Sequence, residues 1–127
     1  LLQALFLLLQ YSTTESATIS ASSDKLKNVL DYIDLHYAKP LTISELAELC
    51  YFSEYHFMRF FKKHMNMTCI QYINNVRLEK AVELFEHGET SILEVSLSVG
   101  FHNLSYFHRA FNSKYHMTPL SFIKRLN

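Results

Sequence analysis

Apolar residues return at helical spacing in the segment after residue 23. They lie three and four positions apart, as expected for the buried face of an α-helix. Ser23 precedes them as a candidate N-cap, and Lys39-Pro40 follows them as a stop signal. The pattern therefore predicts a helix that begins after Ser23 and ends before Lys39-Pro40. The residues on its buried face are Leu26, Val29, Leu30, Ile33 and Tyr37.

A second set of helix signals runs from residue 42 to residue 64. Glu45 follows Thr42 at the spacing of a capping box, in which each side chain bonds the other residue's backbone N–H. This box predicts a short helix through Cys50. After a short break, Ser53 is a candidate N-cap for a second helix from Glu54 to His64.

Another capping box, made by Thr68 and Gln71, opens a longer helix that Gly88 closes. A helix from Thr68 to about His87 is roughly 27–30 Å long at about 1.5 Å per residue. Its length is close to the ~34 Å between successive major-groove openings on one face of DNA. The residues expected on its inner face are Ile70, Ile73, Val76, Ala81, Leu84 and Phe85.

The same signals return after Gly88, which indicates an internal duplication. Ser91 and Glu94 repeat Thr42 and Glu45 at a distance of 49 residues, and one inserted residue near Gly100 makes the later distance 50. Two copies are too few for a solenoid, so the pattern predicts two similar lobes. The later matching residues are Asn103, Phe107, Arg109, Phe111, Met117, Thr118, Phe122 and Ile123, against Ser53, Phe57, Arg59, Phe61, Met67, Thr68, Tyr72 and Ile73.

Each copy has the organisation of a helix-turn-helix, in which the second helix enters the DNA major groove. Two short helices also form corners in many helical cores, so the exposed residues matter. The second helices are expected to bury Phe57, Phe60, Phe61, Phe107, Ala110 and Phe111. The outward residues are then Glu54, Tyr55, Met58, Arg59 and Lys62 in the first copy, and His102, Leu104, Ser105, Tyr106, Arg109 and Lys114 in the second.

Exposed tyrosine, methionine and leucine beside an arginine are unusual on a surface that meets only water. Such a face suits base edges, because apolar groups contact thymine methyls and arginine bonds guanine bidentately. Arg59 and Arg109 are therefore candidates for base or phosphate contacts, with surface ion pairs as the alternative. Lys62, Lys63 and Lys114 would attract phosphates of any sequence. The candidate phosphate anchors at helix starts are the backbone N–H groups at Thr42 and Ser91.

The second copy also carries a specific motif. It reads Ser91-Ile92-Leu93-Glu94-Val95, then Val99-Gly100-Phe101-His102-Asn103-Leu104-Ser105-Tyr106-Phe107-His108-Arg109-Ala110-Phe111, then Met117-Thr118-Pro119 and Phe122. In order, type and spacing, residues 24–127 resemble the C-terminal DNA-binding domain of AraC/XylS-type bacterial transcription regulators. The resemblance implies an all-α domain of seven helices, with two helix-turn-helix subdomains joined by a long central helix. It also implies a transcription regulator, commonly an activator that meets RNA polymerase.

The resemblance assigns the DNA-reading residues position by position. Tyr55 and Met58 join Arg59 in the first reader, while Leu104, Ser105 and Tyr106 join Arg109 in the second. The chain departs from the family at Tyr51, Asn66 and His116, where glycine is common, and at Cys69, where proline is frequent. Asparagine accepts positive φ more readily than tyrosine or histidine does. These departures concern the geometry of the turns and not the fold.

Composition and charge agree with this interpretation. Two Gly and two Pro in 127 residues are too few for the turns of a β-sandwich or barrel. Twelve basic and 12 acidic residues argue against a polyanion partner unless the charges are segregated. They are segregated, because residues 1–54 carry a formal charge of −4 and residues 55–127 of +4.

Signals for other chemistries are not found in the sequence. The seven His show no HExxH or close Cys/His spacing, and no nucleophile–base set indicates catalysis. Cys50 and Cys69 lie in apolar surroundings, which favours reduced thiols in the cytoplasm. We therefore expect no metal, no cofactor and no enzyme. The alternative to DNA binding is a helical protein-interaction adaptor, which Glu54 beside the first reader favours.

The first 23 residues differ from the remainder. Leu1–Leu9 is an apolar run about half as long as the ~20 residues of a membrane span. It is interpreted either as the end of a helix that packed on a missing domain or a dimer partner, or as a loose tail. Residues 11–23, rich in Ser and Thr, are predicted to be a flexible linker. The DNA-binding domain is then residues 24–127, with helix-turn-helix units at about 42–64 and 91–115 and a connecting helix at about 68–87.

Overall fold

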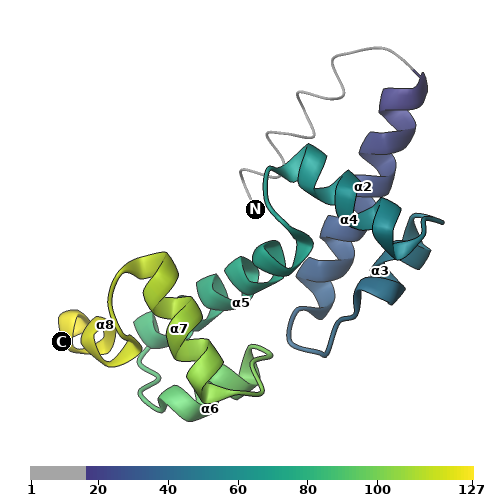
Figure 1. The fold of residues 1–127 in the computed structure, drawn as a ribbon. Helices are drawn as coiled ribbons and strands as arrows, with labels where there is room; N and C mark the ends of the chain where they lie inside the picture. Colours follow the sequence, from purple (N-terminus) through teal and green to yellow (C-terminus); the bar gives the residue numbers. More distant parts are fainter. Residues whose placement is uncertain (1–16) are drawn as a thin grey trace. The chain divides into compact units, whose positions relative to one another are not determined.

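The computed structural model describes residues 17–127. The apolar run Leu1–Leu9, with its expected role in dimerisation, lies outside the described residues, as does the start of the predicted linker. Seven α-helices and no strand are found between residues 17 and 127, which confirms the all-α expectation (Figure 1). The helices are α2 (Ala17–His36), α3 (Ile43–Leu49), α4 (Glu54–Met65), α5 (Cys69–Glu86), α6 (Ile92–Ser98), α7 (Leu104–Tyr115) and α8 (Pro119–Leu126).

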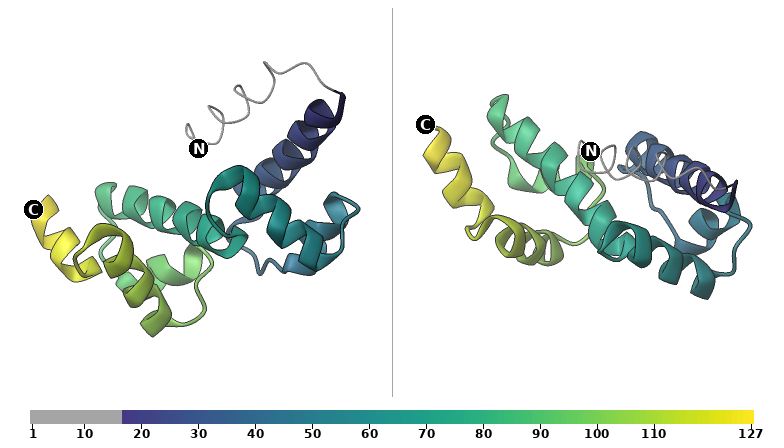
Figure 2. Two further views of the ribbon diagram at one scale, coloured as in Figure 1. Left: turned by 45° about the horizontal axis from the view of Figure 1, so that its top comes forward. Right: turned by 90° about the horizontal axis from the view of Figure 1, so that it is seen from above.

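The chain divides into two compact units. Of the described residues, unit 1 holds 17–36 and 41–72, and unit 2 holds 37–40 and 73–127. A short helix packs against a longer one in each unit, α3 against α4 and α6 against α7 (Figure 2). The duplication in the sequence is therefore also a duplication of local structure.

The first helix begins earlier than the sequence analysis predicts. Helix α2 starts at Ala17, so Ser23 lies inside the helix and the predicted linker is wrong for residues 17–23. This stretch contains no Gly or Pro, and adding turns to a formed helix requires no new nucleation. The helix ends at His36, before Lys39-Pro40 as predicted. Tyr37 lies beyond the helix and packs against the core of unit 2.

The other predicted helix starts are capped by the expected side chains. In the capping box of α3, Glu45 N donates to Thr42 Oγ1 at 3.1 Å and Thr42 N donates to Glu45 Oε1 at 2.8 Å. The Thr68 and Gln71 pair repeats this arrangement before α5. These bonds satisfy N–H groups that the first turn leaves without helical partners, so they fix where each helix begins. The caps of α4, α6 and α7 are Ser53, Ser91 and Asn103.

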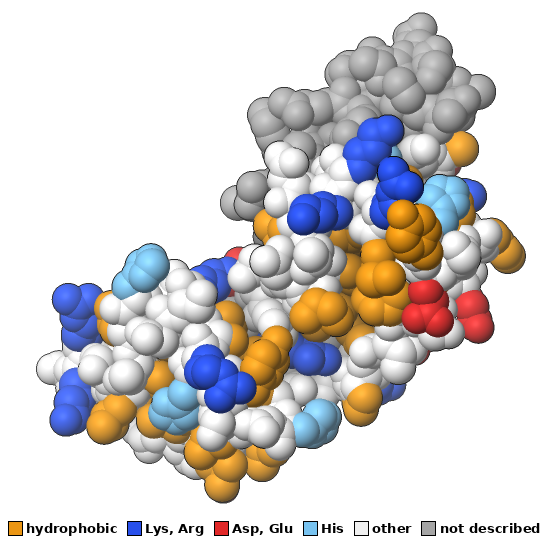
Figure 3. Space-filling view, in the orientation of Figure 1, with side chains coloured by type: hydrophobic (Ala, Val, Ile, Leu, Met, Phe, Trp, Pro, Cys, Tyr) orange, Lys and Arg blue, Asp and Glu red, His pale blue; other side chains and the backbone are white. Residues whose placement is uncertain are grey.

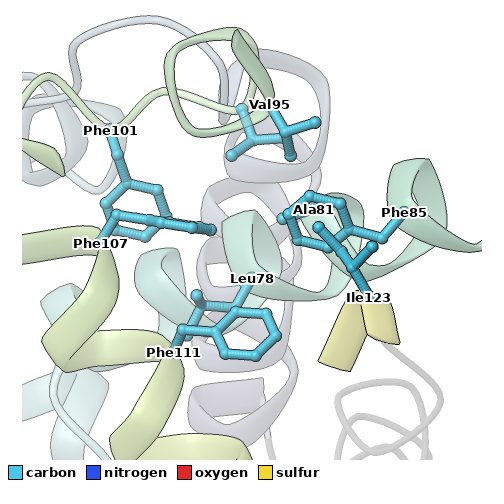
Figure 4. Close-up of a cluster of buried hydrophobic side chains, with 9 residues drawn as sticks. Leu78, Ala81, Phe85, Val95, Phe101, Phe107, Phe111 and Ile123 are labelled. Atoms are coloured by element: carbon cyan, nitrogen blue, oxygen red, sulfur yellow. The ribbon is translucent and has the colours of Figure 1, made fainter. Parts of the chain in front are cut away.

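The core of unit 2 is a cluster of apolar side chains from α5, α6, α7 and α8 (Figure 4). Phe111 is its centre, with ring centroids 5.8 Å from Phe107 and 6.2 Å from Phe85. Tilted and edge-on ring contacts of this kind are favoured over face-to-face stacking. They fix which side of α7 is buried, and hence which side faces solvent.

Helix α5 carries two buried stripes in place of the single inner face that was predicted. Ile70 was expected to be buried but is 47% exposed, and Leu84 is only half-buried. Because α5 supplies side chains to both units, its apolar residues do not repeat on one face. The first stripe is Cys69, Tyr72, Ile73 and Val76, and the second is Leu78, Ala81 and Phe85.

Three turns contain a left-handed residue that is not glycine. Tyr51, Asn66 and His116 have φ of 58°, 58° and 59°. These are the positions at which the sequence departs from the glycines of the AraC/XylS pattern. The backbone therefore keeps the glycine-like turn, and each of these residues bears the strain of a left-handed backbone. Gly88 closes α5 with φ of 101°, as predicted.

Candidate nucleic-acid interface

Helix α4 separates a buried aromatic side from an exposed side that mixes polar and apolar residues. Phe57, Phe60 and Phe61 are buried, as the sequence predicts. The opposite side exposes residues at helical spacing, so they form one continuous surface. This surface, the first reader face, consists of Tyr55, Met58, Arg59 and Lys62.

An arginine–tyrosine pair lies on the first reader face. Arg59 Nη1 donates to Tyr55 Oη at 3.4 Å, and the guanidinium lies 5.5 Å from the centre of the tyrosine ring. Both residues are on α4 and exposed to solvent, with Tyr55 67% exposed. The pair therefore depends on one helix alone, and water competes with both contacts.

A shallow apolar cavity of about 260 Å³ adjoins the first reader face. Ile43, Met58, Cys69 and Ile70 form much of its lining, and Arg59 and Lys62 border it. Ile70 is exposed because it lies at this cavity and not in the core. The sequence analysis missed this site, since an isoleucine at helical spacing was assigned to the inner face of α5.

Helix α7, in unit 2, has the same buried aromatic side and mixed exposed side as α4. Phe107 and Phe111 are buried and Ala110 is half-buried, as predicted. On the face shown in Figure 3, basic and hydrophobic side chains lie side by side over α7. The exposed surface of α7, the second reader face, consists of Leu104, Ser105, Tyr106 and Arg109.

Tyr106 is held by a residue outside its own helix. Asn74, on α5, donates from Nδ2 to Tyr106 Oη at 2.6 Å. The Arg109 guanidinium lies 5.9 Å from the centre of the Tyr106 ring. Sequence reasoning missed Asn74, although an asparagine in a helix interior is a signal, since its side chain tends to find a specific partner there.

The expected phosphate-attracting lysines differ between the units. Lys62 and Lys63 are exposed on α4. Lys114 was expected to face solvent, but it is half-buried and its Nζ lies 3.3 Å from Glu79 Oε1 on α5. Because Glu79 neutralises Lys114 within unit 2, this lysine attracts phosphate less than the sequence suggested.

The two helix starts considered as phosphate anchors also differ. The Thr42 N–H already donates to the Glu45 carboxylate, which places a negative group at this end of α3. Ser91 Oγ accepts from Glu94 N at 3.2 Å, so its hydroxyl acts as the cap. Both residues therefore act as helix caps. The Thr42 N–H, which was expected to contact phosphate, is already bonded to Glu45.

Arg77 joins α5 to residues 37–40 inside unit 2. Its Nε donates to Tyr37 O at 2.7 Å and its Nη2 donates to Lys39 O at 3.0 Å. Burial lowers the pKa of Arg77 below its ordinary value. Hydrogen bonds from a charged donor are stronger than those from a neutral one, so Arg77 is a structural tie.

Both cysteines are buried free thiols in unit 1. Burial raises the pKa of Cys69 to about 12 and also raises the pKa of Cys50. Within residues 17–127, no three His, Cys, Asp or Glu side chains gather where they could hold a metal ion. None of the described helices is long and apolar enough to cross a membrane.

Comparisons with known proteins agree with the geometry. A family model described as a helix-turn-helix domain matches residues 46–125. An uncharacterized HTH-type transcriptional regulator of Bacillus subtilis, YdeC, is 36% identical over 105 residues, which cover 83% of this chain and 36% of YdeC. This chain thus spans about a third of that relative's length.

Two solved structures share the fold. The C-terminal domain of AraT, a response regulator from Geobacillus stearothermophilus, aligns with a TM-score of 0.72 and 27% identity, covering 78% of this chain and 83% of that one. A probable AraC family transcriptional regulator from Rhodopseudomonas palustris aligns with a TM-score of 0.74 and 25% identity, covering 82% and 98%. Both similarities extend over most of the described residues.

Proposed function

The chain belongs to the AraC/XylS family of helix-turn-helix transcription regulators, and on this premise we propose that it binds double-stranded DNA sequence-specifically and regulates transcription. One observation carries the proposal. Two capped second helices, α4 and α7, each bury phenylalanines on one side and present an arginine with a tyrosine on the other. Such a surface supplies both charge for phosphates and donors for base edges.

In this proposal α4 and α7 enter adjacent major grooves. Arg59 and Arg109 contact bases or phosphates, and Tyr55, Met58, Leu104, Ser105 and Tyr106 contact neighbouring groups. Lys62 and Lys63 supply attraction that does not depend on sequence. The apolar cavity beside Met58 and Ile70 is suited to a thymine methyl group, because the surrounding side chains offer it little but carbon and sulfur.

The proposal extends to activation of transcription in the bacterial cytoplasm through contact with RNA polymerase. The family relationship supports this extension. YdeC is about three times as long as the aligned region, so a sensing function would belong to other parts of such a protein. A second copy of the chain is a further partner, through Leu1–Leu9.

The test begins with selection of bound duplexes from a random DNA pool. Arg109→Ala should weaken binding to the selected duplex by about 1–3 kcal/mol and relax the preference at one base pair. Lys124→Ala removes the same charge from the exposed end of α8 and should leave the base preference unchanged. Unchanged affinity and base preference in Arg109→Ala would count against the assigned role.

A salt titration separates this function from the protein-interaction adaptor. DNA binding should weaken linearly in a plot of log affinity against log salt, because the protein displaces counterions from phosphates. Glu54 is exposed at the start of α4 and favours the adaptor, since a carboxylate repels DNA. No retention on DNA at low salt would favour that alternative.

A further inference from the structure

The hydrogen bond between Asn74 and Tyr106 ties the second reader face to α5 within unit 2. Asn74 lies on α5, between the buried residues Ile73 and Val76. Its backbone is therefore anchored in the helix that carries the core, while its side chain reaches the hydroxyl of Tyr106 at 2.6 Å. A tyrosine held at its hydroxyl as well as at its backbone keeps one ring position, because both ends of the side chain are fixed.

The ring of Tyr106 in turn orients Arg109. The guanidinium lies 5.9 Å from the ring centre, within the range of a cation–π contact. Among the described residues, no hydrogen bond or ion pair to Arg109 is found. All its side-chain N–H groups are thus left to a ligand, and two of them can be donated together to the N7 and O6 acceptors of guanine.

In unit 1, no described residue on another helix forms a hydrogen bond to the tyrosine or the arginine of the reader face. Arg59 donates one of its N–H groups to Tyr55, and both side chains belong to α4. Tyr55 is 67% exposed, whereas Tyr106 is 39% exposed. Among the described residues, the pair on α4 has no hydrogen bond to another helix, while the pair on α7 has one, from Asn74 on α5.

We propose that Asn74 is a positioning residue that sets the base specificity of unit 2 by holding Tyr106 and, through it, Arg109 in the geometry that binds guanine. The inference rests on the proposed DNA binding. The Tyr106 hydroxyl accepts from Asn74, so its own hydrogen points away from Asn74 and donates to a phosphate or base acceptor. Unit 2 is then the discriminating reader, and unit 1 tolerates more sequences.

The experiment uses the whole chain and duplexes selected from a random pool by the unmodified protein. The base pair read by unit 2 is the one whose guanine preference disappears in Arg109→Ala; a bidentate contact gives a preference of about 5- to 150-fold. The preference at that base pair is then measured in Asn74→Ala, Tyr106→Phe and the double variant. Thermal unfolding of each variant is measured in parallel.

Asn74→Ala should reduce the guanine preference at that base pair by about threefold or more while preferences in the other half-site stay unchanged. Tyr106→Phe keeps the ring but loses the hydroxyl, so it should lose at least as much of the guanine preference, and the double variant should be no worse than Tyr106→Phe alone. Asn28→Ala, an exposed asparagine on α2, serves as the matched control and should change neither preference.

Three results would overturn the inference. An unchanged guanine preference in folded Asn74→Ala would show that Tyr106 and Arg109 need no such support. Equal losses in both half-sites would show a general effect on folding. Strictly additive effects in the double variant would show that Asn74 and Tyr106 act independently. These failures leave the proposed function standing, whereas an unmodified protein that selects no duplex would refute DNA binding itself.

Discussion

The two helix-turn-helix units form the same left-handed turn with different residues, a tyrosine in unit 1 and a glycine in unit 2. In unit 1 the residue after the short helix is Tyr51, with φ of 58° and a side chain that is 92% exposed. In unit 2 the corresponding position is Gly100, which is buried with φ of 109°. The first turn bears backbone strain but no crowding, and the second avoids strain but has no room for a side chain.

The reason for the difference lies in what covers each turn. A Cβ atom on Gly100 would lie 2.7 Å from both Arg77 Nε and the Tyr37 carbonyl oxygen. That oxygen and that nitrogen are joined by the hydrogen bond that ties residues 37–40 to α5. Unit 2 therefore depends on glycine at its turn because Arg77 crosses it, while Tyr51 points into solvent.

The largest predicted effect is the loss of stability in Gly100→Ala. The new methyl group meets backbone as well as side chain, and the alanine must adopt a strained φ, so we expect a cost of about 2–4 kcal/mol in the free energy of unfolding. Urea denaturation measures it. Gly88→Ala is the matched control, because φ is 101° there and no atom lies within 4 Å of the added Cβ.

The loss of stability in Gly88→Ala measures the cost of the strained backbone alone, which we expect to be about 1–2 kcal/mol. If both alanine variants lose the same amount of stability, the contact of the added methyl group with Arg77 and Tyr37 costs no measurable free energy. Crowding would then not explain why unit 2 has glycine at its turn and unit 1 does not.

A smaller and opposite effect is predicted for Tyr51→Gly. Glycine relieves the left-handed strain, at about 1–2 kcal/mol, and adds conformational entropy to the unfolded chain, at about 0.4–1 kcal/mol. The net result should be stabilisation by about 0.5–1 kcal/mol, because the exposed tyrosine makes little packing contact. A thermal unfolding midpoint that falls in Tyr51→Gly would indicate that its side chain contributes to packing after all.

The turns that follow α4 and α7 give a second comparison of left-handed residues between the two units. Asn66 and His116 occupy equivalent positions with φ of 58° and 59°, and both are exposed. Asparagine tolerates this region better than histidine, so His116→Gly should stabilise by about 0.5 kcal/mol more than Asn66→Gly. Urea midpoints of the two variants, measured side by side, test the difference; equal midpoints would contradict it.

Much of this fold could be predicted from the sequence, for reasons that are local. Capping boxes such as that of Thr42 and Glu45 depend on residues three positions apart, and the buried faces of α4 and α7 follow from helical spacing. The start of α2 could not be predicted, because Ser23 has the side chain of a preferred N-cap but lies inside the helix. Local signals therefore found the helices more reliably than their boundaries.

The candidate site was predictable only in part, because its support comes from distant residues. Arg59 and Arg109 were found through the duplication, and the structure exposes both. The tie from Asn74 to Tyr106 joins residues 32 positions apart, and the pairing of Lys114 with Glu79 joins residues 35 positions apart. Such contacts depend on tertiary packing and leave no periodic signal in the sequence.

The smallest predicted effect is a dependence of stability on pH. It comes from one position at which the two units have different residues. His64 near the end of α4 corresponds to Lys114 near the end of α7. Burial, together with the charge of Lys63, lowers the pKa of His64 below its ordinary value. The unfolded chain then binds a proton more readily than the folded chain, so stability should decrease as pH falls through the unfolded pKa of about 6.5.

The decrease should level off below the folded pKa of His64, where both states are protonated. His64→Gln removes the titration and should flatten this part of the stability profile between about pH 7 and pH 5. Urea denaturation across that range measures it, and His108→Gln on α7 is the matched control. An identical slope in His64→Gln and in the unmodified protein would mean that this histidine does not make unit 1 the more acid-sensitive half.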